Sequence, residues 1–80
     1  MNSVTQFGQI VKFHRQQSGL SQLALATLAG VGKTVIYDIE KGKQTMRFDT
    51  LTKVLNALNI RMELQSPLMA AFQESIDENG

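Results

Sequence analysis

The sequence predicts an all-α fold, in which a bundle of four short helices is followed by one short strand and a short fifth helix. Apolar residues recur at three- and four-residue spacing in four segments, and glycine separates most of these segments. Only residues 60–65 alternate apolar with polar side chains, which is typical of a strand. Because 80 residues bury only about 60% of the unfolded surface, the chain forms one core. We expect residues 1–59 to form the bundle, and residues 60–80 to form the strand, the fifth helix and an acidic tail.

The first predicted helix begins after Thr5, whose hydroxyl can cap it. Its inward face combines residues at positions i, i+3, i+4 and i+7: Phe7, Ile10, Val11 and His14. Gly19 can adopt the left-handed conformation that closes a helix. Since the chain has no cysteine and no second histidine, we interpret His14 as a packing residue and not as a metal ligand or catalytic base.

The next two predicted helices span residues 22–29 and 33–40 and are separated by a very short turn. Ser21 is suited to cap the first of them, and Gly30 can take a positive φ in the turn. Val31 is an apolar residue within that turn, where it can fill the space between two helices that meet at a steep angle. Such a turn presents the second helix, with Ile36 and Ile39 inward, so that it can enter a duplex groove.

The fourth predicted helix covers roughly residues 48–58, and its apolar face contains Leu51, Val54, Leu55 and Leu58. The strand that follows has no other strand to pair with in this chain. Its mate is therefore predicted to be the same segment of a second subunit across a two-fold axis. Ser66 and Pro67 then introduce a helix that reaches about Ile76, with Met69 and Phe72 on the same side. The last four residues are expected to fray.

The net charge of +1 conceals a strong asymmetry along the chain. Residues 1–61 contain all eight basic side chains and three acidic ones, a balance of +5, whereas residues 62–80 contain four acidic side chains and no basic one. A basic globular part with an acidic tail favours a domain that binds a polyanion. Ordinary surface charge gives a similar asymmetry, so the charge pattern indicates polyanion binding only where the basic residues share a face.

Several function classes find no support in the residues. The chain has no cysteine for a disulfide or thiolate site, no glycine-rich phosphate loop and no credible set of serine, histidine and carboxylate. Its amino terminus lacks a secretory pattern, and no apolar run approaches the ~18 residues of a membrane span. We expect a non-enzymatic cytoplasmic protein that binds no cofactor, metal or membrane.

The stretch "LSQLALATLAGVGKTVIYDIEKG" resembles the helix-turn-helix of the lambda-repressor-like family, also called Cro or XRE-type. About ten positions agree in residue type and spacing. Residues 5–65 most closely resemble HipB-type antitoxins, the DNA-binding members of HipA-kinase toxin-antitoxin modules, in "TQFGQIVKFHRQQSGLSQ", "YDIEKGKQTMRFDTLTKVLNALNI" and "IRMEL". The tail from Ser66 is longer and more helical than this resemblance implies.

The resemblance implies a nucleoid-associated homodimer that binds double-stranded operator DNA, represses its own operon and has a HipA-type kinase toxin as its partner. It implies that three residues contact DNA bases: Lys33, Thr34 and Tyr37. It implies that four residues contact the DNA backbone: Gln22, Val35, Lys41 and Lys43. It implies that three residues belong to the shared dimerisation strand: Ile60, Met62 and Leu64. It also implies an ion pair between Arg15 and Glu40.

The chemistry of these side chains agrees with such roles. A lysine can donate to guanine O6 and N7, a threonine can meet both a phosphate and a thymine methyl, and a tyrosine can reach a phosphate or a base edge. Two alternatives stay open. The chain could chiefly be a protein-binding inhibitor of a kinase toxin that keeps the helix-turn-helix as a scaffold. It could also be a phage-type or metabolic repressor without a toxin partner.

Overall fold

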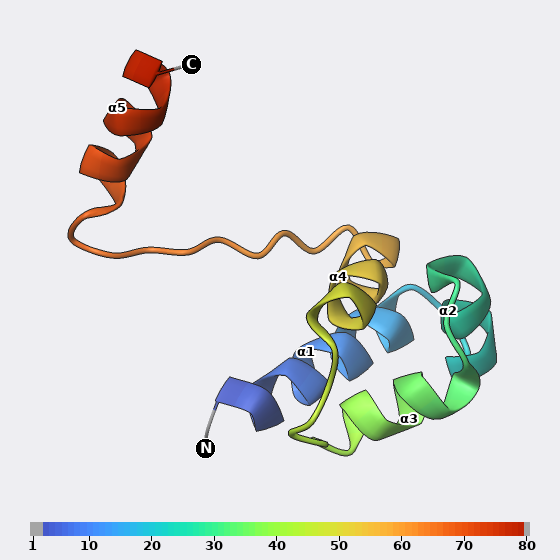
Figure 1. Cartoon of the computed structure of the whole chain (residues 1–80). Helices are drawn as coiled ribbons and strands as arrows, with labels where there is room; N and C mark the ends of the chain where they lie inside the picture. Colours follow the sequence, from blue (N-terminus) through green and yellow to red (C-terminus); the bar gives the residue numbers. More distant parts are fainter. Residues whose placement is uncertain (1–2, 80) are drawn as a thin grey trace.

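A computed structural model describes residues 3–79, which form five α-helices (Figure 1). These are α1 (Ser3–Gln17), α2 (Gln22–Ala29), α3 (Lys33–Glu40), α4 (Phe48–Ala57) and α5 (Met69–Asn79). The first four pack into a bundle, whereas α5 stands apart at the end of a long linker. None of the described helices is both long enough and apolar enough to cross a membrane. The predicted all-helical bundle is therefore confirmed.

Helix α1 begins at Ser3, so the prediction that Thr5 caps it is wrong. No glycine or proline precedes Thr5, and the helix is longer than predicted by three residues, 3–5. Its predicted end is confirmed, because Gly19 has a φ of 72° and its amide donates to the carbonyl of Gln16 over 3.0 Å. Half-buried His14 donates from Nδ1 to the carbonyl of Ile10 over 2.7 Å, a local structural contact.

The turn between α2 and α3 forms as predicted. Ser21 Oγ accepts a hydrogen bond from the amide of Ala24 over 3.0 Å, which caps α2. Gly30 takes a φ of 73°, and the amide of Val31 donates to the carbonyl of Ala26 over 3.0 Å. The side chain of Val31 is half-buried and packs against the core. The apolar residue in the turn thus anchors the angle between the two helices.

The core draws residues from all four helices of the bundle. Its fully buried members are Val11, Leu25, Ala26, Ile36, Ile39, Val54 and Leu55. Burying each large aliphatic side chain contributes about 1.5–3 kcal/mol. At the crossing of α1 and α3 the backbones approach so closely that a Cβ on Gly8 would collide with the carbonyl oxygen of Ile39. This packing fixes the rotation of α3 about its own axis.

Helix α4 ends at Ala57, one residue before the predicted end, and Asn59 follows with a φ of 59°. The amide of Ile60 donates back to the carbonyl of Leu55 over 2.9 Å, which closes the helix. Residues 60–66 then run without regular secondary structure, and no strand forms anywhere in residues 3–79. A single strand gains no ladder hydrogen bonds in one chain, so the predicted strand requires a partner that one protomer does not supply.

Helix α5 starts at Met69, whose amide donates to the carbonyl of Ser66 over 3.2 Å. It continues to Asn79, three residues past its predicted end at Ile76. No glycine or proline interrupts residues 69–79, and the next glycine is Gly80. Residues 77–79 are therefore part of the helix, and Gly80 lies outside the described residues.

Candidate nucleic-acid interface

The outer face of α3 presents the three residues predicted to contact bases. Lys33, Thr34 and Tyr37 are exposed, whereas Ile36 and Ile39 on the opposite side are fully buried. Positions 33, 34 and 37 share a face because a helix turns once every 3.6 residues. The buried isoleucines therefore hold the three polar side chains toward solvent.

The amino end of α2 lies beside this face. Gln22 lines one shallow surface depression together with Lys33, Thr34 and Tyr37. The structure thus brings together a residue from the first helix of the pair and the exposed residues of the second. Helix α3 itself has Gly32 at its N-cap and no side-chain cap. Amide groups at such an end can bind phosphate or water.

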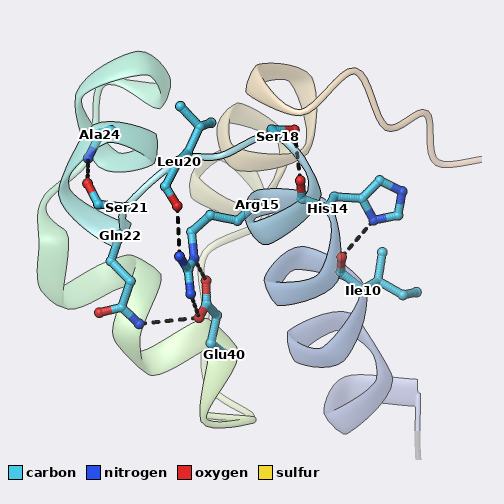
Figure 2. A network of polar contacts seen from close by, with 9 residues as sticks. All are labelled: Ile10, His14, Arg15, Ser18, Leu20, Ser21, Gln22, Ala24 and Glu40. Carbon is cyan, nitrogen blue, oxygen red and sulfur yellow. Dashed lines mark hydrogen bonds and ion pairs between the residues drawn. The ribbon is translucent and has the colours of Figure 1, made fainter.

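A partly buried network of polar contacts positions Gln22 (Figure 2). Its Nε2 donates to Glu40 Oε1 over 3.2 Å. Arg15 donates from Nε to Glu40 Oε2 over 2.6 Å and from Nη2 to Oε1 over 3.0 Å. Arg15 Nη1 also donates to the carbonyl of Leu20 over 2.8 Å. The network therefore joins α1, the turn after it, α2 and the end of α3.

The Arg15–Glu40 pair is well shielded, since the side chains are 12% and 5% exposed. The hydrogen bond to Glu40 raises the pKa of Arg15, and this effect exceeds the opposing effect of burial. Arg15 therefore stays charged, and its two hydrogen bonds hold the pair in one bidentate geometry. The implied pairing of these two residues is present, and its role is to join helices.

The two lysines after α3 differ in their surroundings. Lys41 Nζ lies 5.2 Å from the centre of the Tyr37 ring, a cation–π contact. Lys43 Nζ lies 3.4 Å from Asp38 Oδ2, so a carboxylate partly neutralises it. Lys41 thus adds positive charge at the edge of the α3 face, whereas Lys43 adds less.

Val35 occupies a different environment from the other predicted contact residues. Its amide donates to the carbonyl of Gly32 over 3.0 Å, and its half-buried side chain packs against the core. The main-chain donor that a phosphate would need is already engaged. The position of Val35 favours packing over a polar contact.

Lys12 of α1 is a candidate that sequence reasoning missed. It is exposed and lines a second depression, which is shared with Arg15, Gln22, Tyr37, Glu40 and Lys41. A signal was present, because Lys12 lies three residues before Arg15 and therefore on the same side of α1. Three lysines, Lys12, Lys33 and Lys41, therefore surround Gln22 and Tyr37.

The residues predicted to mediate dimerisation also come together. Ile60, Met62 and Leu64 of the linker lie along α4 and line a groove with α4 residues that include Phe48, Thr52 and Leu55. We call this the α4 groove. It is mostly apolar and lies apart from the depression that α2 and α3 form.

In the described part of the chain, no group of three His, Asp or Glu side chains could hold a metal ion.

Comparisons with known proteins match the part of the chain that contains α2 and α3. A family model described as Helix-turn-helix matches residues 11–65. An uncharacterized HTH-type transcriptional regulator named y4mF, from Sinorhizobium fredii, is 35% identical over 60 residues, which cover 75% of this chain and 79% of the relative. Another uncharacterized HTH-type transcriptional regulator, from Haemophilus influenzae, is 48% identical over 44 residues. This match covers 55% of this chain and 45% of the Haemophilus influenzae protein.

Solved structures show the same similarity in three dimensions. The HipB chain of the HipA-HipB-O2-O3 complex superimposes with a TM-score of 0.74 at 30% identity, covering 84% of this chain and 94% of HipB. A HipB variant in a complex with an O2 20mer also superimposes with a TM-score of 0.74 at 30% identity. This match covers 84% of this chain and 93% of that HipB chain. The family match ends at residue 65, so α5 lies beyond it.

Proposed function

The chain belongs to the Helix-turn-helix family of DNA-binding transcriptional regulators, and from this premise we propose that it is a dimeric repressor of its own operon and the antitoxin of a toxin-antitoxin module. One observation carries the DNA-binding part of the proposal. Gln22 of α2 and Lys33, Thr34 and Tyr37 of α3 line a single exposed depression. This is the arrangement that groove docking by the second helix of the pair requires.

In the proposed complex, α3 lies in the major groove and its three exposed polar residues contact base edges. Lys33 donates to guanine O6 and N7, Thr34 contacts a thymine methyl or a phosphate, and Tyr37 reaches a base edge or a phosphate. Each good base contact discriminates against a wrong base by about 1–3 kcal/mol. Their position at the amino end and outer face of α3 supports this assignment.

Gln22, Lys41 and Lys43 bind the DNA backbone in this proposal, and Lys12 joins them. Gln22 sits at the start of α2, where its amide and the free N–H groups can hold one phosphate. Lys12 and Lys41 lie at the rim and attract phosphate independently of sequence. Val35 adds an apolar contact only, because its amide is engaged with Gly32.

Residues 60–80 supply the dimer contacts, and residues 1–59 bind DNA. We propose that Ile60, Met62 and Leu64 form a strand that pairs with the same segment of a second copy. Two strands related by a two-fold axis satisfy each other's backbone groups, which one protomer leaves unpaired. The two α3 helices then reach successive major grooves about 34 Å apart, or a multiple of that distance, so the operator is an inverted repeat.

The antitoxin assignment is supported by the likeness to HipB, which covers 84% of this chain at 30% identity. That HipB chain belongs to a complex with HipA and with O2 and O3. By analogy, the partner of this chain is a HipA-type kinase encoded beside it. The test is whether a neighbouring kinase copurifies with this chain and alters its mobility shift on DNA. Absence of such a kinase would instead favour a repressor without a toxin.

Operator binding is tested by a mobility shift on the DNA immediately upstream of the gene. A Lys33→Ala, Tyr37→Ala double variant is expected to bind roughly 10- to 100-fold more weakly, because two groove contacts are lost. Affinity is also expected to fall steeply with salt, and Lys33→Ala alone is expected to lower the salt slope by about one.

A matched control removes one aromatic ring and one lysine outside the α2–α3 surface. Phe13→Ala with Lys53→Ala changes two exposed residues of α1 and α4 in the same way. Its affinity should stay within about twofold of the unaltered protein, as for other neutral surface changes. Equal losses in both double variants, or no preference for an inverted repeat, would contradict the proposal. Survival of kinase binding in the Lys33→Ala, Tyr37→Ala variant would show that the two activities use different surfaces.

A further inference from the structure

Helix α5 carries an apolar stripe that the bundle leaves uncovered. Met69, Phe72 and Ile76 lie at i, i+3 and i+7 and therefore share one face. Phe72 remains 56% exposed, and Leu68 just before the helix is 75% exposed. Figure 1 shows α5 at the far end of the linker, separated from α4. An apolar stripe of this kind marks an interaction surface.

The α4 groove is a second uncovered apolar surface of the chain. Phe48, at one end of it, is 69% exposed, and Leu64, on its linker wall, is 77% exposed. The groove has a volume of about 370 Å³. Since a cavity of about 150 Å³ can hold a benzene ring, the groove has room for a phenyl ring and a neighbouring aliphatic side chain.

The direction of the linker indicates which α5 reaches which groove, and this step rests on the strand pairing proposed above. In an antiparallel pair centred on Met62, Leu64 of one copy lies opposite the partner's Ile60. Ile60 follows directly on the carboxyl end of α4. The chain after Leu64 therefore passes the carboxyl end of the partner's α4, and residues 65–68 lead from there to α5, which begins at Met69.

Lengths and charges fit an antiparallel arrangement of α5 on the partner's α4. Helix α5 has 11 residues and α4 has 10, so their lengths are roughly 16 and 15 Å. Met69 then lies near the carboxyl end of the partner's α4, and Ile76 lies near the partner's Phe48. The acidic carboxyl half of α5, which includes Glu74 and Asp77, meets the positive amino end of the α4 helix. Arg61 on the groove wall adds positive charge.

From these observations we propose that α5 is an exchanged arm: the α5 stripe of each protomer packs in the α4 groove of a second copy of this chain. Phe72 fills the groove, with Met69 and Ile76 on either side of it. The exchange covers both apolar surfaces at once and adds buried area to a strand pair that is short on its own. The arm belongs to the part of the chain that the family match does not reach.

The absence of cysteine from the chain allows a selective crosslinking test. Thr52→Cys places a thiol in the α4 groove, and Gln73→Cys places one beside the α5 stripe. The two full-length single variants, carrying different tags, are coexpressed and treated with a short bismaleimide. The arm exchange predicts a covalent dimer that contains one chain of each variant. Either variant expressed alone should give much less covalent dimer.

The alternative arrangement has a distinct result. If α5 folds onto its own α4, a chain carrying both cysteines crosslinks within itself and the coexpressed single variants do not crosslink to each other. That outcome overturns the exchange, as does a lack of crosslinking in either experiment. A monomeric unaltered protein in sedimentation would overturn the proposed dimer as well. A dimer without the mixed crosslink would overturn only the arm, so the two failures are distinguishable.

A second pair of variants tests the stripe by dimer affinity. Phe72→Asp should weaken dimerisation by about tenfold or more, because it removes the central aromatic anchor. Ala71→Asp introduces the same charge on an exposed position away from the stripe and serves as the control. Its dimer affinity should stay close to that of the unaltered protein. Equal dimer affinities for the two variants would contradict the proposal.

Discussion

The bundle of α1–α4 and the segment after Asn59 cover their apolar side chains in different ways. In the bundle, aliphatic residues from four helices bury one another, as Val11, Leu25, Ile36 and Val54 do with no measurable exposure. After Asn59, Leu64, Leu68 and Phe72 are all more than half exposed. The comparison teaches that the core of α1–α4 closes within one chain, whereas the described residues after Asn59 expose apolar side chains that this bundle leaves uncovered.

Two isoleucines give the sharpest test of this difference. Ile39 of α3 is 1% exposed and Ile76 of α5 is 46% exposed. Ile39→Ala should lower the free energy of unfolding by about 2–5 kcal/mol, because it opens a cavity in the core. Ile76→Ala should cost less, and its effect should depend on protein concentration, because it acts through association. Chemical denaturation at several protein concentrations measures both. Equal, concentration-independent losses would erase the distinction.

The crossing of α1 and α3 provides the next test. An alanine normally stabilises a helix interior relative to glycine by about 1 kcal/mol. Gly8→Ala should instead destabilise the bundle by about 1–3 kcal/mol, because its Cβ collides with the Ile39 carbonyl and forces the helices apart. Thermal unfolding measures the change, and Gln9→Ala on the exposed side of α1 is the control. Stabilisation by Gly8→Ala would show that the two helices separate easily.

The Arg15–Glu40 pair tests whether the bundle depends on its polar network as well as on its core. Glu40→Gln should cost about 2–3 kcal/mol, because Arg15 loses its charged partner in a shielded position. The loss should be reproduced by Arg15→Gln and should not double in the combined variant. Additive losses in the double variant would show that the two residues act independently.

Asp49, on the exposed surface at the start of α4, should give the smallest effect. Burial raises the pKa of Asp49, but the amide of Thr50 and the charge and hydrogen bonds of Arg47 together lower it by more. A carboxylate with a depressed pKa stabilises the fold above its unfolded pKa and loses this contribution as the pH falls through the depressed value. The melting temperature of Asp49→Asn should therefore be slightly lower near neutral pH and should meet that of the unaltered protein once the pH falls below the depressed pKa of Asp49. A difference that persists at low pH would assign the effect to packing.

Local signals account for the parts of the fold that the sequence predicts well. Ser21 caps α2 with its own hydroxyl, and Gly19 and Gly30 act through their own positive φ; each is found in the predicted conformation. The face of α3 was predictable because two isoleucines at three-residue spacing must point inward. The start of α1 was less predictable, because a threonine inside a helix differs little in pattern from one that caps it.

Contacts between distant segments were harder to predict. Lys12 joins the surface of α2 and α3 only because α1 crosses α3 at Gly8, which no local pattern specifies. The side-chain packing of Val35 likewise depends on the fold of the whole bundle. The alternation at residues 60–65 is a real pattern, but the described part of the chain offers it no second strand to pair with. The segment therefore has no regular secondary structure.

The hydrogen bond from Gln22 to Glu40 has a thermodynamic consequence for the proposed complex with DNA. A glutamine that is restrained before association loses less rotamer entropy when it meets a phosphate, so more of the contact energy remains as affinity. Arg15 holds Glu40 in place and would contribute to this preorganisation from α1, without touching the nucleic acid. Operator affinity and the integrity of the helix packing are then thermodynamically linked through one carboxylate.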